Sequence, residues 1–165
     1  MPYVTAVVWE SLRWKNATPL GVPHYLEVED EYEGYRIPRG TVVFSNVWAI
    51  LHDEDLYSEP FEFKPERYFK AGCESVFDPA IKDSTFAAIC PGRHMAYSSV
   101  WIAVASILKT FDISKAMDEH GNVIEPVYES HSSIVATPLP FKYSMKPRSA
   151  EAEELISAAS SALHA

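Results

Sequence analysis

The feature that most constrains the fold is a long apolar helix pattern that follows directly on a Cys-Pro-Gly junction. Apolar residues recur at three- and four-residue steps, at Ala96, Val100, Trp101, Val104, Ile107 and Leu108. This spacing predicts a helix over residues 91–109 with these side chains on one face. The stretch from Met95 to Leu108 is shorter than the roughly 20 apolar residues that cross a bilayer, so we expect it to be a buried helix.

Shorter elements are expected on both sides of this helix, which together indicate an α+β fold. Residues 3–14 have helical spacing of their apolar residues, whereas residues 25–46 contain short aromatic and β-branched runs that predict strands. The sequence Pro-Arg-Gly at residues 38–40 is typical of a hairpin turn. Further along, the patterns predict a short helix at residues 46–51, a strand pair within residues 132–146 and an exposed helical tail over residues 149–165.

Residues 53–72 form a long segment without helical or strand periodicity. This segment contains Pro60 and Pro65 together with many aromatic residues, so it is not polar enough to be a linker. We therefore expect side chains to hold it against the rest of the protein.

Charge and cysteine usage exclude several classes of protein. The 165 residues include 14 Lys and Arg against 23 Asp and Glu, which gives a formal net charge of −9. Because phosphates require a basic face, we expect no nucleic-acid partner. Two cysteines are too few for a disulfide framework and fit a reducing compartment. The apolar residues near the N-terminus lack a preceding basic region, so no signal peptide is expected.

Cys90 has three possible roles on the residues alone. A free cysteine is most often a small buried hydrophobic residue. At a helix start it could instead be a nucleophile with a lowered pKa, and His94 lies one turn away as a base. The third role is that of a metal ligand, although a zinc site needs about four ligands and Cys73, Cys90 and His94 make a poor set.

Glu10 and Arg13 lie three residues apart in the first predicted helix. This spacing allows the two side chains to pair on one face, and an exposed pair of this kind would contribute roughly 0.2–0.5 kcal/mol. Neighbouring Val8 and Trp9 make the helix apolar enough that the pair could be buried, where it would need a third partner. Arg67 is the candidate partner; the alternative is a solvated charge in a loop.

Taken in order, these motifs resemble the cytochrome P-450 superfamily, specifically the C-terminal part of a fungal-type member. "ESLR" at residues 10–13 is similar to the ExxR motif of the family's K helix, and "PERY" at residues 65–68 to its PERF motif. "CPGRHMA" at residues 90–96 resembles the second half of the haem-ligand loop and the start of the proximal helix. "PLPFKYSMKPRS" at residues 138–149 resembles the closing strands.

The resemblance implies a role for each candidate residue. Cys90 would be the axial thiolate ligand of haem iron, and Glu10, Arg13 and Arg67 would form a buried structural ion-pair triad. The remaining haem-binding positions would be His24, Phe86, Ile89 and Gly92. The positions lining the substrate pocket would be Pro19, Leu20, Val22, Ser133 and Ile134.

The resemblance also implies the fold and the reaction. Residues 1–149 would be the C-terminal third or so of a cytochrome P-450 domain, with a K-type helix, a small antiparallel sheet and a long proximal helix, and residues 150–165 an exposed tail. The family is a haem-thiolate monooxygenase that contains haem b, receives electrons from NADPH through a reductase and oxidises small hydrophobic organic substrates. Full-length relatives are usually in the endoplasmic reticulum membrane, whereas these residues, without anchor or signal peptide, are expected to be soluble or cytoplasmic.

The alternative is a truncated, non-catalytic remnant or a partial gene model that binds no haem. Of the family's haem loop, only Cys90 and Gly92 are retained. Asp83, Phe86 and Ala88 occupy the positions of the family's phenylalanine, glycine and arginine. The family's distal oxygen-activating helix also has no counterpart in these residues, so the isolated chain is expected to be inactive.

Overall fold

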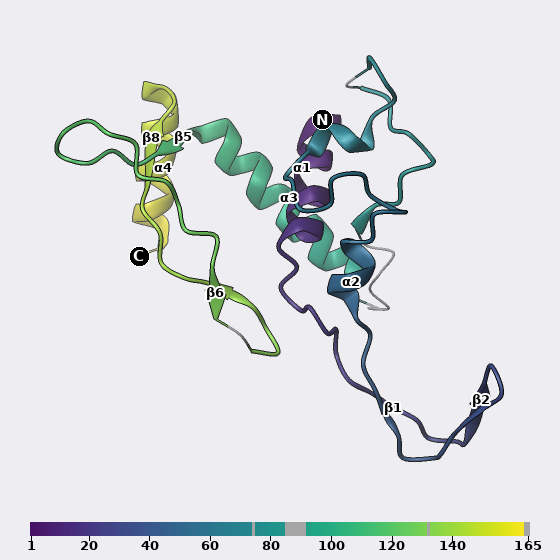
Figure 1. The fold of residues 1–165 in the computed structure, drawn as a ribbon. Helices are drawn as coiled ribbons and strands as arrows, with labels where there is room; N and C mark the ends of the chain where they lie inside the picture. Colours follow the sequence, from purple (N-terminus) through teal and green to yellow (C-terminus); the bar gives the residue numbers. More distant parts are fainter. Residues whose placement is uncertain (74, 85–91, 132, 164–165) are drawn as a thin grey trace. The chain divides into compact units, whose positions relative to one another are not determined.

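The computed structural model describes residues 1–73, 75–84, 92–131 and 133–163 (Figure 1). The fold of this part is α+β, as the sequence predicts, with helices and small two-stranded sheets. The helices are α1 (Pro2–Trp14), α2 (Val47–Leu51), the 3-10 helix η1 (Pro65–Tyr68), α3 (Arg93–Thr110) and α4 (Ala150–Leu163). The strands are β1 (His24–Tyr25), β2 (Asp30–Tyr32), β3 (Tyr35–Ile37), β4 (Val42–Val43), β5 (Phe111–Lys115), β6 (Ser130–His131), β7 (Thr137–Pro138) and β8 (Tyr143–Pro147).

The chain divides into two compact units. The first consists of residues 1–93 and 131–137, and the second of residues 94–130 and 138–165. The core of the first unit joins α1, α2, η1 and the segments on both sides of η1. Its buried members are Ala6, Val47, Leu51, Tyr57, Tyr68 and Phe69.

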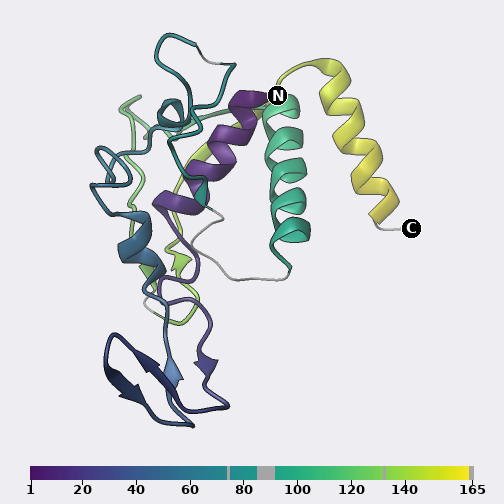
Figure 2. The ribbon, with the colours of Figure 1, turned by 90° about the vertical axis from the view of Figure 1, so that its right-hand side faces the viewer.

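In the first unit, β1 and β4 pair in antiparallel fashion and β2 and β3 form the hairpin between them (Figure 2). Gly34 makes the hairpin turn with a φ of +81°, a region that glycine adopts without strain. The hairpin expected at residues 38–40 is wrong. The Thr41 N–H does donate to the Pro38 carbonyl, but the strands on either side of this turn pair with β2 and β1, not with each other.

In the second unit, β5 and β8 pair along their full length, from Phe111 opposite Pro147 to Lys115 opposite Tyr143. The strand pair predicted within residues 132–146 is therefore wrong in its partners, because β7 pairs with β6 and β8 pairs with β5. The helical tail is present as α4. Its Ala152 is buried, and Ser149 accepts a hydrogen bond from the Ala152 N–H at the helix start.

The expectation of a buried helix over residues 95–108 is also wrong. No residue of α3 is buried, and Ile102 is 62% exposed. Within the described part of the second unit, no other helix or strand packs along much of α3, which leaves its apolar side chains exposed there. No helix of the described chain is both long and apolar enough to cross a bilayer.

Candidate functional site

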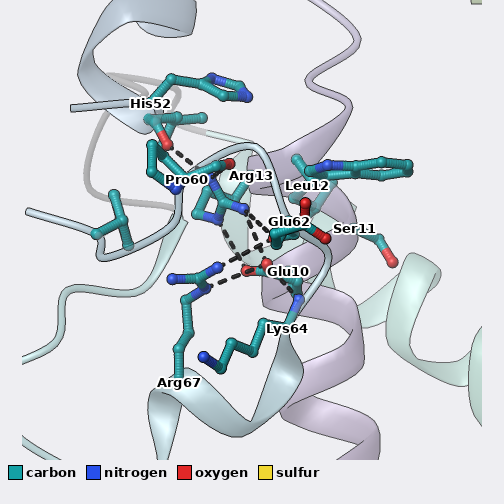
Figure 3. Close-up of polar contacts among 12 residues, drawn as sticks. Glu10, Ser11, Leu12, Arg13, His52, Pro60, Glu62, Lys64 and Arg67 are labelled. Atoms are coloured by element: carbon teal, nitrogen blue, oxygen red, sulfur yellow. Dashed lines mark hydrogen bonds and ion pairs between the residues drawn. The ribbon is translucent and has the colours of Figure 1, made fainter. Parts of the chain in front are cut away.

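The candidate site is a buried charge cluster in which Glu10 lies between two arginines (Figure 3). Arg13 donates from Nε to Glu10 Oε2 and from Nη2 to Glu10 Oε1, both at 2.8 Å. Arg67 donates from Nε to Glu10 Oε1 at 3.2 Å. The Glu10 and Arg13 side chains are fully buried and that of Arg67 is 3% exposed. The structure therefore brings the three residues together in the interior, and the exposed-pair alternative is excluded.

The helical spacing explains how α1 supplies the first two charges. Residues three apart lie on one face of a helix, and here that face packs against η1 and α2. Pro65 begins η1, where its fixed φ suits the first turn of a helix, and the turn carries Arg67 toward Glu10. The three charged side chains are thus positioned by α1 and η1, two helical elements that are favoured by their own local sequence.

Arg13 uses its other N–H groups on backbone carbonyls. Nη1 donates to the carbonyls of Leu51 at 2.9 Å and Pro60 at 2.7 Å, and Nη2 also donates to that of Glu62 at 3.2 Å. These bonds give the N–H donors of the buried guanidinium hydrogen-bond acceptors, without which its removal from water would be costly. They also fix the backbone at the end of α2 and in the loop before η1.

Arg67 and Glu10 hold the same loop from its other side. The Nη1 and Nη2 groups of Arg67 donate to the carbonyls of Ser58, Glu59 and Glu62. Glu10 Oε1 accepts a further bond from the Lys64 N–H at 2.8 Å. A loop without regular structure is therefore ordered by three side chains, those of Arg13, Arg67 and Glu10. This is how the proline-rich segment after residue 53 is held in place by side chains.

The electrostatics of Glu10 favour its charged form. Burial is the largest single influence and raises the pKa of this carboxyl, whereas the hydrogen bonds from Arg13 and the Lys64 N–H lower it. The charges of Arg13 and Arg67 act in the same direction, so the pKa of Glu10 is held below its usual value. The cluster can therefore position and order a backbone, with Glu10 held in its charged form between the two arginines.

One member of this cluster was missed by sequence reasoning. The Tyr57 ring lies 5.3 Å from the Arg13 guanidinium carbon, in the range of a cation–π contact. Its hydroxyl donates to the Lys82 carbonyl at 3.0 Å. Burial raises the pKa of Tyr57, so the hydroxyl stays protonated and remains a donor. The only sequence signal was indirect, since Tyr57 lies in the segment that was expected to need side-chain contacts.

Of the haem-binding residues that the resemblance implies, Cys90, Phe86 and Ile89 lie outside the described residues. Gly92 is exposed directly before α3, and His24 is exposed at the start of β1. Within the described residues no group of three or more His, Cys, Asp and Glu side chains could hold a metal ion.

The residues expected to line the substrate pocket come from two segments of the first unit. The Ala136 N–H donates to the Ala17 carbonyl at 2.7 Å, which joins the segment containing Ser133 and Ile134 to the one that follows α1. In the segment that follows α1, the Pro19 carbonyl accepts a hydrogen bond from the Trp48 N–H at 2.9 Å. Four of the five candidate side chains are exposed, namely Leu20, Val22, Ser133 and Ile134.

Cys73 lies in the loop that follows η1, where its N–H donates to the Lys70 carbonyl at 3.0 Å. Its sulfur is 3.4 Å from the Ser75 hydroxyl, and this hydrogen bond lowers the pKa of the thiol. No apolar helix follows it, in contrast to Cys90.

Comparison with known proteins gives one consistent family. The family described as Cytochrome P450 matches residues 1–145. The chain is 44% identical to cytochrome P450 monooxygenase ple1 of Rhodocybe pseudopiperita, over 95% of this chain and 31% of that protein. It is 47% identical to cytochrome P450 monooxygenase 208 of Postia placenta, over 96% of this chain and 31% of that protein. Tryptamine 4-monooxygenase of Psilocybe cyanescens is 39% identical over 92% of this chain and 31% of its own length. The chain thus spans about a third of the length of the curated relatives it matches.

Proposed function

Since the chain belongs to the cytochrome P450 family, we propose that residues 1–149 are the haem-thiolate portion of a monooxygenase. The observation that carries the proposal is the family match over residues 1–145, which includes both motifs that supply the buried cluster. In this assignment α1 is the K-type helix, α3 is the proximal helix, and α4 is an exposed tail. The cluster of Glu10, Arg13 and Arg67 is a structural triad and not a catalytic one.

The proposed axial ligand of haem iron is Cys90. The 18-residue helix α3 begins at Arg93, three positions after Cys90 in the sequence, and the positive end of a helix dipole stabilises a nearby anion such as a thiolate. A thiolate is also the ligand type that haem iron accepts, so the chemistry of this position fits the group. When bound, haem b would supply the oxygen-activating chemistry, because the thiolate donates electron density to the iron.

The other haem-binding residues are proposed to enclose and orient the group. Phe86 and Ile89 would supply apolar contacts, and Gly92 would allow close approach of the backbone. His24 is exposed and can therefore reach a propionate carboxylate without breaking a buried contact. Its role is to orient the group and not to transfer a proton.

The substrate is proposed to be a small hydrophobic organic molecule, held by Pro19, Leu20, Val22, Ser133 and Ile134. The hydrogen bond between Ala136 and Ala17 supports this, because it brings the two segments to one region of the first unit. The relatives are named as monooxygenases, and one of them as acting on tryptamine. Electrons would come from NADPH through a reductase, and attachment of the whole protein to the endoplasmic reticulum membrane is part of the same proposal.

The second candidate is a chain that binds no haem. The exposure of α3 favours it, since exposed apolar side chains such as Ile102 are an aggregation liability. In that case the first unit would keep its charge cluster and core but have no redox activity.

The absorption spectrum of the purified 165-residue chain after addition of haemin distinguishes the two candidates. A saturable Soret band with a thiolate signature supports the haem-thiolate proposal. A spectrum that matches free haemin at every protein concentration contradicts it and supports the second candidate.

A further inference from the structure

We infer that Tyr57 is a positioning residue that couples the buried charge cluster to residues 78–84, the segment that leads in sequence toward Cys90. The inference rests on the proposed function for its relevance to Cys90. Its structural basis, however, lies wholly within the described residues of the first unit. Tyr57 is 1% exposed and its two ends contact different parts of that unit.

The ring end of Tyr57 belongs to the cluster. Its centroid is 5.3 Å from the Arg13 guanidinium carbon. A cation held over an aromatic face is stabilised by the ring quadrupole, more so when both are out of water. The N–H groups of Arg13 donate in the guanidinium plane to Glu10 and to backbone carbonyls, so the ring contact adds a stabilisation that these hydrogen bonds do not supply.

The hydroxyl end of Tyr57 belongs to residues 78–84. It donates to the Lys82 carbonyl at 3.0 Å, across 25 positions of the sequence. The start of the same segment is held at the Asp78 N–H, which donates to the Tyr68 carbonyl at 2.9 Å. A turn follows in which the Ile81 N–H donates to the Asp78 carbonyl. Tyr57 thus fixes the far end of a segment whose near end is fixed by η1.

The position of Lys82 gives this contact its consequence. Lys82 lies eight positions before Cys90 in the sequence. By holding the Lys82 carbonyl, the Tyr57 hydroxyl fixes the point from which the chain continues toward the proposed ligand. Arg13 and Tyr57 touch, and therefore a disturbance of the cluster reaches Lys82 through a single side chain. The hydrogen bond is a positioning contact and takes no part in the chemistry.

Tyr68 provides a matched control within the same core. It is also 1% exposed, and its ring packs edge-on against Trp9 at 5.3 Å. Its hydroxyl, however, has no hydrogen-bond partner in the part of the chain that the structure describes. Tyr57→Phe and Tyr68→Phe therefore delete the same atom at the same burial, but only the first deletes a hydrogen bond.

The test compares amide hydrogen exchange in the 165-residue chain and in the two variants. Tyr57→Phe should speed exchange at Asp78 and Ile81 by about tenfold, the order expected for loss of one hydrogen bond. Exchange in α3 should not change, which separates a local effect from a general loss of stability. Tyr68→Phe should leave exchange at both amides within about twofold, because no hydrogen bond is removed. Equal exchange in the two variants at Asp78 and Ile81 would overturn the inference.

A haemin titration of the same variants links the segment to Cys90. Tyr57→Phe should lower the fraction of bound haem that shows the thiolate signature, whereas Tyr68→Phe should match the wild-type chain. Retention of the full signature in Tyr57→Phe would overturn the positioning role and leave the proposed function intact. If the wild-type chain shows no thiolate signature, the proposed function is contradicted. The hydrogen-exchange comparison alone then tests whether Tyr57 couples the cluster to residues 78–84.

Discussion

Arg13 binds both carboxylate oxygens of Glu10 from the next turn of the same helix, with two hydrogen bonds of 2.8 Å. A bidentate pair fixes the plane of the guanidinium as well as its position. The remaining N–H groups of Arg13 therefore point in set directions, toward the carbonyls of Leu51, Pro60 and Glu62. One local pair within α1 thus determines the path of a loop about 50 residues further along the chain.

The first prediction concerns the cost of breaking this pair. Arg13→Ala should lower the free energy of unfolding by about 3–5 kcal/mol, because it leaves a buried Glu10 charge without its main partner. Urea denaturation of the variant and the wild-type chain measures the loss. Arg36→Ala is the control, since the Arg36–Glu29 pair is exposed and should contribute little. A loss no larger than that of the control would mean that the cluster does not stabilise the fold.

The second prediction separates the charge of Arg67 from its shape. Arg67→Lys keeps the positive charge but cannot reach Glu10 and the carbonyls of Glu59 and Glu62 together. Carbonyls left without a donor should lower the free energy of unfolding by about 1–3 kcal/mol. Loop order can be followed by limited proteolysis between residues 58 and 64, which should become faster. Unchanged proteolysis would argue that the charge alone is sufficient.

The third prediction concerns acid stability. The pKa of Glu10 lies below its ordinary value of 4.5 in the folded protein, so its stabilising contribution is complete above that value and is lost as the pH falls through the folded pKa. Glu10→Gln should be less stable at neutral pH and should show a shallower loss of stability below pH 4.5. Unfolding free energies across that range provide the measurement. An acid dependence as steep as that of the wild-type chain would exclude Glu10 as its source.

The charge pair could be predicted from the sequence, but its surroundings could not. The spacing of Glu10 and Arg13 fixes their shared helix face, and the apolar residues of α1 indicate burial. The partners of Arg13 are backbone carbonyls of Leu51, Pro60 and Glu62, and no residue type marks a carbonyl as an acceptor. These contacts become visible only when the loop is folded.

Strand pairing shows the same limit. The sequence pattern indicates a strand pair within residues 132–146, yet the partner of β8 is β5, more than 25 residues earlier in the sequence. The residues of β5 alternate between apolar and polar only over Phe-Asp-Ile-Ser, which is a short strand signal, and nothing in it identifies β8 as the partner. Local patterns report which face of an element is apolar, whereas pairing depends on which distant segment supplies the complementary edge.

The fourth prediction concerns His52, which follows α2. Its Nδ1 lies 2.9 Å from the Trp48 carbonyl, and its ring stacks on that of Trp48 at 4.6 Å. Burial lowers the pKa of His52 below 6.5, and the charges of Arg13 and Lys15 act in the same direction. The unfolded chain therefore binds the proton more readily, so stability is complete above pH 6.5 and decreases as the pH falls below it.

His52→Gln should reduce this loss of stability between neutral pH and the acid range. Thermal unfolding at several pH values measures the loss. His120→Gln is the control, because the His120 side chain is 76% exposed and should leave the pH dependence unchanged. If both variants keep the wild-type pH dependence, His52 does not contribute to it.

The most direct test of the haem-thiolate proposal is the absorption spectrum of haemin-loaded Cys90→Ser and Cys73→Ser. Serine removes the thiolate with little change in size, so each variant tests one sulfur as the iron ligand. The account predicts that Cys90→Ser loses the thiolate signature and that Cys73→Ser keeps it in full. Loss of the signature in Cys73→Ser, with its retention in Cys90→Ser, would contradict the account.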